Sequence, residues 1–194
     1  MYKHTPLPAK NPYEQNRKTV RWAYHDYATS GIYYITIVTK DRYYYFGDIV
    51  DEKMIFTEQG KIAEECLLDI PNHYSMVNIL NHVVMPNHIH ILFQIDNEEA
   101  DQEDYERLCK TGGVNMREIR RKTHGKNTVS DIMGAFKAAV TRQCNRRHLE
   151  FDWLGRFYDH VVRNEEERLA YDRYIRNNIM NWDIEKNGDL DEHL

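Results

Sequence analysis

The first hydrophobic pattern along the chain is an extended one. Residues 31–40 (GIYYITIVTK) are rich in β-branched and aromatic side chains, which predicts a strand in the centre of a sheet. Residues 43–49 and 53–56 flank a polar turn and predict a short hairpin. Thr57 can then cap a helix to about Asp69, because apolar residues recur at helical spacing. These apolar residues are Ile62, Ala63, Cys66, Leu67 and Ile70.

Two more extended segments follow the stop of that helix at Pro71. Residues 76–85 and 88–95 are rich in strand-forming residues and are separated by a Pro-Asn break at Pro86. They predict an antiparallel pair of strands or one bent strand. Residues 96–127 are polar and aperiodic, and we expect them to form a long surface connection.

The last part of the chain predicts helix, strand and helix. A helix is predicted over residues 128–147, capped by Thr128 or Ser130. Residues 151–163 contain aromatic and β-branched side chains and predict a last strand of the sheet. Residues 164–181 begin with the pattern N-x-x-E, which resembles a capping box, and predict a final helix.

The order of these elements predicts the fold class. Strand, hairpin, helix, two strands, helix, strand and helix are typical of an α+β fold in which helices pack on an antiparallel sheet. A chain of 194 residues with 41% hydrophobic residues has the profile of one globular domain. We therefore expect a single domain over residues 1–194, with an N-terminal extension over residues 1–28.

Charge is distributed unevenly along the chain. The net charge of −5 argues mildly against a nucleic-acid partner. Residues 98–106 are strongly acidic, however, whereas residues 117–147 are basic, and a polyanion responds to local potential within about 10 Å. The basic residues are Arg117, Arg120, Arg121, Lys122, Lys126, Lys137, Arg142, Arg146 and Arg147. The basic stretch is either a nucleic-acid contact or an ordinary solvated helix face.

Composition also narrows the cellular setting. No apolar run approaches the roughly 20 residues that cross a bilayer, and the polar, proline-interrupted start is unlike a signal peptide. We expect a cytoplasmic protein with no membrane partner. The three cysteines, Cys66, Cys109 and Cys144, are widely spaced, so neither a disulfide framework nor a cysteine zinc site is indicated.

Two histidines are candidates for metal binding. His88 and His90 are two residues apart on a predicted strand, so their side chains point to the same face. Ile89, Ile91 and Phe93 alternate to the other face, which we expect to lie in the core and to leave the histidine face open for a ligand. Such a pair is either part of a metal site or two ordinary polar residues.

The final helix supplies further candidates. Its apolar stripe should dock on the sheet and consists of Tyr171, Ile175, Ile179 and Trp182. Tyr174 and Asn178 are one turn apart on the adjacent face, so a hydroxyl and an amide project together. They are either a nucleophile and a metal ligand held by a rigid element, or a partly buried structural pair.

Several segments resemble a known family. VVMPNHIHIL resembles the HUH motif of single-tyrosine transposases, and YIRNNIMNW resembles the segment that carries the tyrosine in REP-associated tyrosine transposases. Residues 17–49, the FKAAVTR helix and FDWLGRFYDHVVRN resemble further blocks of that family, in the same order. The likeness covers nearly the whole chain apart from the acidic connection and the tail after Trp182. It implies a ferredoxin-like or RRM-like HUH endonuclease fold, with a C-terminal helix that carries the tyrosine.

The resemblance also implies a site and a reaction. A divalent metal, magnesium or manganese, would be bound by His88, His90 and Asn178, and Tyr174 would be the nucleophile. Tyr174 would attack a phosphodiester of single-stranded DNA and form a 5′-phosphotyrosine, from which strand transfer and DNA transposition follow. His160 is a candidate helper in removing the phenolic proton, or a structural histidine.

Single-stranded or hairpin DNA is the implied partner of a nucleoid-associated monomer or homodimer. We expect basic residues to contact the DNA, namely Arg117, Arg120, Arg121, Lys122, Arg142 and Arg146. Exposed aromatic residues among Tyr43, Tyr44 and Tyr45 could stack on bases.

Two departures from the family leave other readings open. Ile179 stands where the family has proline, which should let the helix continue, and Leu154 stands where glutamine is common. The alternatives are a nucleic-acid-binding domain that has kept the fold but cuts nothing, and a metal-dependent hydrolase of small phosphoesters. Binding that is insensitive to Tyr174→Phe would indicate the former, and turnover without a covalent adduct the latter.

Overall fold

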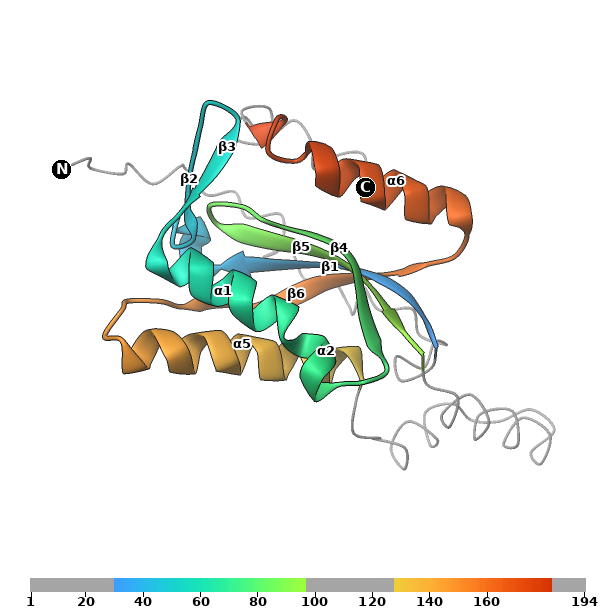
Figure 1. Ribbon diagram of the computed structural model, residues 1–194, viewed down its shortest axis with the longest axis horizontal. Coiled ribbons are helices and arrows are strands. Elements are labelled where there is room, and N and C mark those ends of the chain that lie inside the picture. Colours follow the sequence, from blue (N-terminus) through green and yellow to red (C-terminus); the bar gives the residue numbers. More distant parts are fainter. Residues whose placement is uncertain (1–29, 97–127, 183–194) are drawn as a thin grey trace.

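In the computed structural model, which describes residues 30–96 and 128–182, four strands form an antiparallel sheet (Figure 1). Their order is β4-β5-β1-β6, so that β1 and β5 occupy the centre. This arrangement confirms that the first predicted strand is central and that the two segments around Pro86 form an antiparallel pair. The strands are β1 (Gly31–Thr39), β4 (Val77–Val84), β5 (His88–Ile95) and β6 (Trp153–Val162).

Helices cover both faces of this sheet (Figure 1). On one face α1 and α5 pack against each other and against the main core, and on the other face α6 lies alone across the strands. The helices are α1 (Glu58–Leu68), α2 (Ile70–His73), α5 (Val129–Arg146) and α6 (Glu165–Asn177). Among the described residues, none of the helices is long and apolar enough to cross a membrane.

The pairing of β1 with β5 sorts side chains between the two faces. Ile35 lies opposite Ile91, and both are buried in the main core beneath α1 and α5. Thr36 lies opposite His90, and both point to the face that α6 covers. Burial of an aliphatic side chain contributes about 1.5–3 kcal/mol, so the main core fixes this register strongly.

Side chains at the helix starts hold the elements that surround the site. Thr128 caps α5 in a complete capping box with Asp131, which selects Thr128 from the two predicted caps. Asn164 caps α6 by accepting a hydrogen bond from the backbone N–H of Glu167. The Glu167 carboxylate accepts from the backbone N–H of Arg163 instead of reaching Asn164, so the predicted box at α6 is only half formed.

The predicted strand over residues 43–49 is wrong in its first half. A hairpin of β2 (Gly47–Val50) and β3 (Lys53–Phe56) does form, but it begins only at Gly47. Lys40–Arg42 forms a short 3-10 turn, after which the carbonyl oxygen of Tyr43 accepts a hydrogen bond from the Thr39 hydroxyl. The backbone groups that a longer strand would need are thus bonded within the turn.

The predicted end of the first helix near Asp69 is confirmed, since α1 ends at Leu68, but the short helix α2 that follows was not predicted. Pro71 sits in the first turn of α2, where a missing N–H costs nothing. The final helix ends at Asn177, whereas we predicted about Asn181. Residues 178–181 continue as turns, with the Asn178 N–H bonded to the carbonyl oxygen three residues back, on Ile175.

Part of the predicted organisation lies outside the described residues. This applies to the N-terminal extension over residues 1–28 and to residues 97–127 of the predicted connection.

Two glycines provide a test of the packing that supports the site. A Cβ on Gly60 in α1 would overlap the backbone carbonyl oxygen of Phe46, whose N–H is bonded to Pro86 just before the histidines. A Cβ on Gly134 in α5 meets nothing within 4 Å. We expect Gly60→Ala to lower the free energy of unfolding by about 2 kcal/mol, as overpacking does. Gly134→Ala should raise it by about 1 kcal/mol. Urea denaturation measures both, and equal effects would contradict this packing.

Candidate active site

The two strand histidines meet at the end of β5 where the chain leaves the Pro-Asn turn. The His88 and His90 rings are 4.6 Å apart between centroids and inclined by 73°. Both face the α6 side of the sheet, as their spacing predicted. His90 is only 5% exposed.

Helix α6 brings the predicted tyrosine to this pair. The Tyr174 ring lies 5.2 Å from the His90 ring, edge to face. Farther along the chain, the Trp182 ring lies 5.9 Å from the His88 ring. Asn178 stands between Tyr174 and Trp182 in the sequence and is 0% exposed. The structure therefore places Asn178 on the stretch of chain that spans the two histidines.

An apolar contact seats this helix. Tyr171 and Ile175 of α6 pack with Tyr34 and Leu92 of the sheet in a second, small core. The rings of Tyr34 and Tyr171 stack at 4.2 Å. This confirms the docking predicted from the helical stripe, but it corrects the expectation that the histidine face stays open, because α6 covers it.

Each histidine is held through its Nδ1 atom. Nδ1 of His88 is 2.7 Å from Oδ1 of Asn87. Nδ1 of His90 is 2.7 Å from the Tyr34 hydroxyl and 2.9 Å from Oγ1 of Thr36. Among the described residues, Nε2 of His90 is buried and has no hydrogen-bond partner. A buried nitrogen in that condition costs about 1–3 kcal/mol unless something binds it.

Burial keeps both imidazoles neutral. It lowers the pKa of His88 to about 3, with a smaller contribution from the Arg42 guanidinium. Burial also lowers the pKa of His90 well below its ordinary value, and the neighbouring His88 adds to this. A neutral imidazole is the form that binds metal ions.

These donors fit a weakly held divalent ion. In the part of the chain that the structure describes, no three His, Cys, Asp or Glu side chains form a group. A metal here would rely on two imidazoles and the Asn178 amide, with water completing its coordination. The orphaned Nε2 of His90 and the neutral state of both rings agree with that donor set.

His160, the predicted helper, lies elsewhere on the same face. Its Nε2 atom is 3.3 Å from the Glu167 carboxylate, and its ring is 5.5 Å from the Tyr171 ring. Both partners precede Tyr174 in α6. The structure thus places His160 beside the beginning of the helix, apart from His88 and His90.

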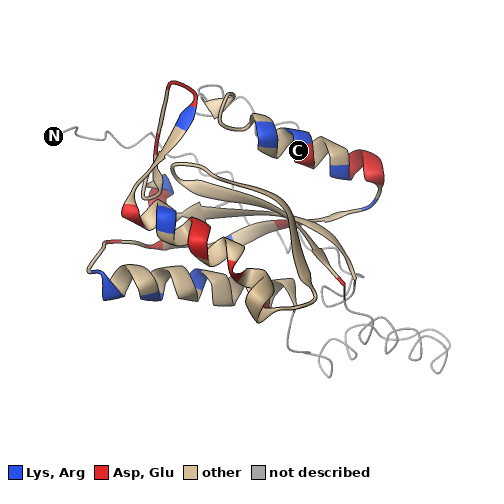
Figure 2. Ribbon diagram, viewed as in Figure 1, with Lys and Arg blue, Asp and Glu red and all other residues tan. Residues whose placement is uncertain are grey.

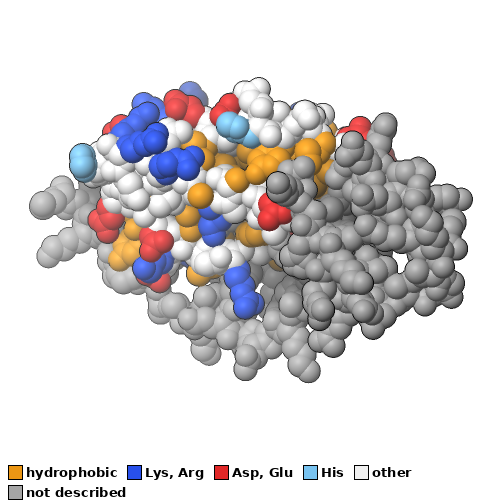
Figure 3. Space-filling view, turned by 90° about the horizontal axis from the view of Figure 1, so that it is seen from below, with side chains coloured by type: hydrophobic (Ala, Val, Ile, Leu, Met, Phe, Trp, Pro, Cys, Tyr) orange, Lys and Arg blue, Asp and Glu red, His pale blue; other side chains and the backbone are white. Residues whose placement is uncertain are grey.

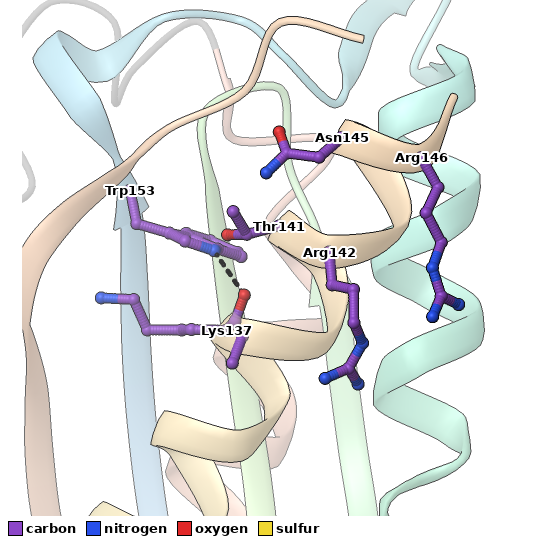
Figure 4. A pocket seen from close by; sticks show the side chains of 7 residues that line it. Lys137, Thr141, Arg142, Asn145, Arg146 and Trp153 are labelled. Carbon is purple, nitrogen blue, oxygen red and sulfur yellow. Dashed lines mark hydrogen bonds between the residues drawn. The ribbon is translucent and has the colours of Figure 1, made fainter. Parts of the chain in front are cut away.

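Of the predicted DNA-contacting residues, some lie in the part of the chain that the structure describes and others lie outside it. Arg117, Arg120, Arg121 and Lys122 lie outside the described residues. Arg142 and Arg146 lie together on α5, beside a shallow groove of about 610 Å³ (Figure 4). Figure 3, seen from the α5 side, shows Lys and Arg side chains gathered toward one end of the described surface. The groove is also lined by Lys137, Ala138, Thr141, Asn145 and Trp153.

Lys137 and Trp153 give this groove its floor, and sequence reasoning missed both roles. The Lys137 ammonium donates to the carbonyl oxygen of Leu154 at 2.7 Å and lies 5.7 Å from the Trp153 ring centroid. The Trp153 Nε1–H donates to the carbonyl oxygen of Lys137 at 3.2 Å (Figure 4). Figure 2 shows that the basic residues of α5 lie on the half of the helix toward its C-terminal end. The signal in the sequence is the polar spacing of Lys137, Thr141 and Asn145, at every fourth residue.

The structure also revises the predicted stacking aromatics. Tyr43 is 54% exposed, as a base platform requires. Tyr44 is half-buried against Trp182, and Tyr45 packs on Phe151 of the main core. Only Tyr43 of the three is freely accessible.

Comparisons with known proteins agree with this fold. No protein-family model matches the chain. An uncharacterized protein of Haemophilus influenzae is 29% identical over 170 residues, which cover 87% of this chain and 91% of that protein. The solved structure of a REP-associated tyrosine transposase bound to a REP hairpin is similar with a TM-score of 0.55 and 16% identity. That similarity covers 86% of this chain and 74% of the transposase chain. The predicted α+β fold with an antiparallel sheet is thereby confirmed.

A second solved structure is a transposase candidate from Deinococcus radiodurans. It is 17% identical, with a TM-score of 0.42, over 79% of this chain and 94% of that one. A similarity of this size is too low to add to the argument.

Acid should destabilise the protein through the two histidines. Their pKa values are depressed in the folded chain, so protons bind preferentially to the unfolded chain. The stabilising contribution is complete above the unfolded pKa of about 6.5 and is lost as the pH falls below it. Between pH 7 and pH 5 we expect the free energy of unfolding to fall by about 2 kcal/mol from His88, with His90 acting in the same direction. Urea denaturation at the two pH values tests this. His90→Gln should show a clearly smaller loss, and an unchanged loss would refute the assignment.

Proposed function

We propose that this chain is a metal-dependent, single-tyrosine HUH endonuclease of the transposase type, which nicks single-stranded DNA and transfers the strand. One observation carries the proposal. Tyr174 lies against His90, whose buried Nε2 atom has no hydrogen-bond partner among the described residues. A nucleophile beside two neutral histidines is the arrangement that phosphodiester attack needs.

His88, His90 and Asn178 would hold the divalent ion, magnesium or manganese. An ion held there would supply Lewis-acid chemistry, which would offset the negative charge that builds on the phosphoryl oxygens during attack. The protein itself supplies orientation, because α6 is seated by Tyr171 and Ile175 and cannot slide without breaking the small core. Tyr174 is thus presented by a rigid element instead of a loop.

Tyr174 performs the covalent step. Its phenolic oxygen forms a bond to phosphorus, and the bond from phosphorus to the 3′ oxygen of the preceding nucleotide breaks. The phenolic proton passes to water or a base, and the departing 3′ oxygen takes up a proton. The product is a 5′-phosphotyrosine and a free 3′ hydroxyl. A different 3′ hydroxyl can reverse the step, and that reversal joins new DNA ends.

The covalent intermediate is directly testable. With manganese and labelled single-stranded oligonucleotides that carry hairpins from the flanks of the gene, we expect a protein–DNA band on denaturing gels. Mass spectrometry should map it to Tyr174, and Tyr174→Phe and chelator should each abolish it. Tyr158→Phe is the matched control, since Tyr158 faces the same side of the sheet with its ring 6.5 Å from that of Tyr34. It should leave the band intact.

The same experiment separates the competing functions. Tight DNA binding without an adduct, whichever divalent metal is added, would favour a binding domain that has lost catalysis. The observation that favours this alternative is that α6 covers the face of the sheet on which the histidines lie. Turnover of a small phosphodiester that survives Tyr174→Phe would instead indicate a hydrolase.

The α5 groove is the proposed second contact with DNA. It belongs to the face of the sheet opposite α6, so its cations meet the phosphate backbone away from the nick (Figure 1). Arg142 and Arg146 are exposed there, and the largely buried Trp153 contributes to the lining. Cations beside an aromatic surface suit a nucleic-acid backbone better than a small neutral ligand.

Neutralising both arginines should weaken binding without touching the chemistry. For Arg142→Gln with Arg146→Gln we expect lower affinity for a hairpin oligonucleotide. The slope of log affinity against log salt should fall by about 2, because each phosphate contact contributes roughly one unit. Fluorescence anisotropy across a salt series measures this. The control is Lys61→Gln, which changes an exposed lysine on α1. An equal change of affinity and salt slope in this variant would show that general electrostatic attraction, and not the groove, explains the binding.

A further inference from the structure

The two candidate metal ligands are held by different side chains of the fold. Asn87 holds His88, and Tyr34 with Thr36 holds His90. None of these three residues follows from the HxH pattern itself. Their contacts determine which ring nitrogen carries a proton, and therefore which nitrogen can bind a cation.

The orientation of Asn87 is fixed from three directions. Its Nδ2 atom donates to the carbonyl oxygen of Arg42 at 3.3 Å. Its own backbone oxygen accepts from both the N–H and the hydroxyl of Thr39, each at 2.9 Å. With the NH2 group committed to Arg42, it is the amide oxygen that faces His88.

That orientation sets the tautomer of His88. An amide oxygen only accepts hydrogen bonds, so Nδ1 of His88, at 2.7 Å, must carry the proton. In a neutral imidazole the other nitrogen, Nε2, then holds the lone pair. His88 is thereby presented as a ligand through Nε2.

The same outcome follows for His90 by a different route. Tyr34 and Thr36 place two hydroxyl oxygens within 2.9 Å of Nδ1, and either can accept its proton. A proton on Nε2 would be buried without an acceptor among the described residues, whereas a lone pair there can bind a cation. The tautomer with the proton on Nδ1 is therefore the one that suits a cation site.

Tyr34 has a second set of contacts on the tyrosine helix. Its ring is almost fully buried, stacks on Tyr171 at 4.2 Å and meets the edge of Tyr174 at 6.3 Å. One side chain thus contacts a candidate ligand through its hydroxyl and the helix of the candidate nucleophile through its ring. A shift of α6 would therefore move the His90 ring through Tyr34, and a change at His90 would in turn displace α6.

We propose that Asn87 and the Tyr34–Thr36 hydroxyl pair are positioning residues that accept the Nδ1 protons of both histidines and so leave each lone pair on Nε2 for a divalent cation, and that Tyr34 couples this cation site to the tyrosine helix. The proposal rests on the proposed function and names the residues that prepare its site. These residues touch neither metal nor DNA. Their effect passes through His88, His90 and α6.

Manganese affinity of the full chain is the test, measured from free Mn²⁺ by electron paramagnetic resonance. We expect Asn87→Leu, and Tyr34→Phe combined with Thr36→Val, each to weaken Mn²⁺ binding about tenfold or more. Asn87→Asp keeps an acceptor at His88 and should restore binding to at least the original level. Tyr158→Phe, on the same face but without a bond to His90, should leave affinity unchanged.

A second readout records the tautomers directly. Nitrogen-15 NMR of the histidine rings should show Nδ1–H at both positions in the original protein and a mixture in Asn87→Leu at His88. Because Asn87 lies in a turn, its variants remain informative even where the Tyr34 variant fails to fold.

The outcomes separate this proposal from the proposed function. Folded variants that bind Mn²⁺ as well as the original chain, while the Tyr174 adduct still forms, would overturn the positioning role alone. If the original chain binds no Mn²⁺ at millimolar concentration, both the positioning role and the metal-dependent mechanism fall. Loss of affinity in Tyr158→Phe equal to that of the Tyr34 variant would also overturn it, since general packing would then explain the effect.

Discussion

The register between β1 and β5 is the constraint on which the rest of the molecule depends. Ile35 opposite Ile91 and Thr36 opposite His90 are successive pairs on opposite faces. A slip by one residue would send His90 into the aliphatic core and Ile91 out beneath α6. The main core under α1 and α5 therefore does more than stabilise the fold, because it also keeps two imidazoles on the face where Tyr174 arrives.

Burying the two imidazoles on the α6 face of the sheet costs free energy. Burying imidazoles requires hydrogen-bond partners for their nitrogens, and the fold provides these at Nδ1 through Asn87, Tyr34 and Thr36. It leaves Nε2 of His90 unsatisfied among the described residues. An arrangement that satisfies one ring nitrogen well and neglects the other is poor as pure packing and reasonable for a ligand site. The apolar seat of α6 on Tyr34 and Leu92 offsets that cost.

The periodicity of the sequence predicted most of the strands and helices, and the wrong predictions are confined to short segments. Strands and helices with strong patterns, such as 31–40 and 128–147, were predicted within one or two residues. The strand at Tyr43 failed because left-handed backbone at Asp41 and Arg42 forms a turn that propensities do not reveal. At the site, spacing placed His88 and His90 on one face of a strand and Tyr174 on a docking helix, but only the family resemblance implied that the three residues meet. Spacing could not supply Asn87 or Tyr34, because their roles arise from hydrogen bonds across strands that no local pattern encodes.

Ile179 shows how tertiary contacts can replace a local signal. With isoleucine instead of proline at position 179, the helix was expected to continue to about Asn181, yet regular helix ends at Asn177. The next turns are irregular: the N–H groups of Asn178 and Trp182 bond to carbonyl oxygens three residues back, whereas that of Asn181 bonds four residues back, to Asn177. This irregular end accompanies a fully buried Asn178 and a Trp182 ring held between His88 and Tyr44. The end of the regular helix therefore coincides with the buried contacts of Asn178 and Trp182, and it comes about without a proline at position 179.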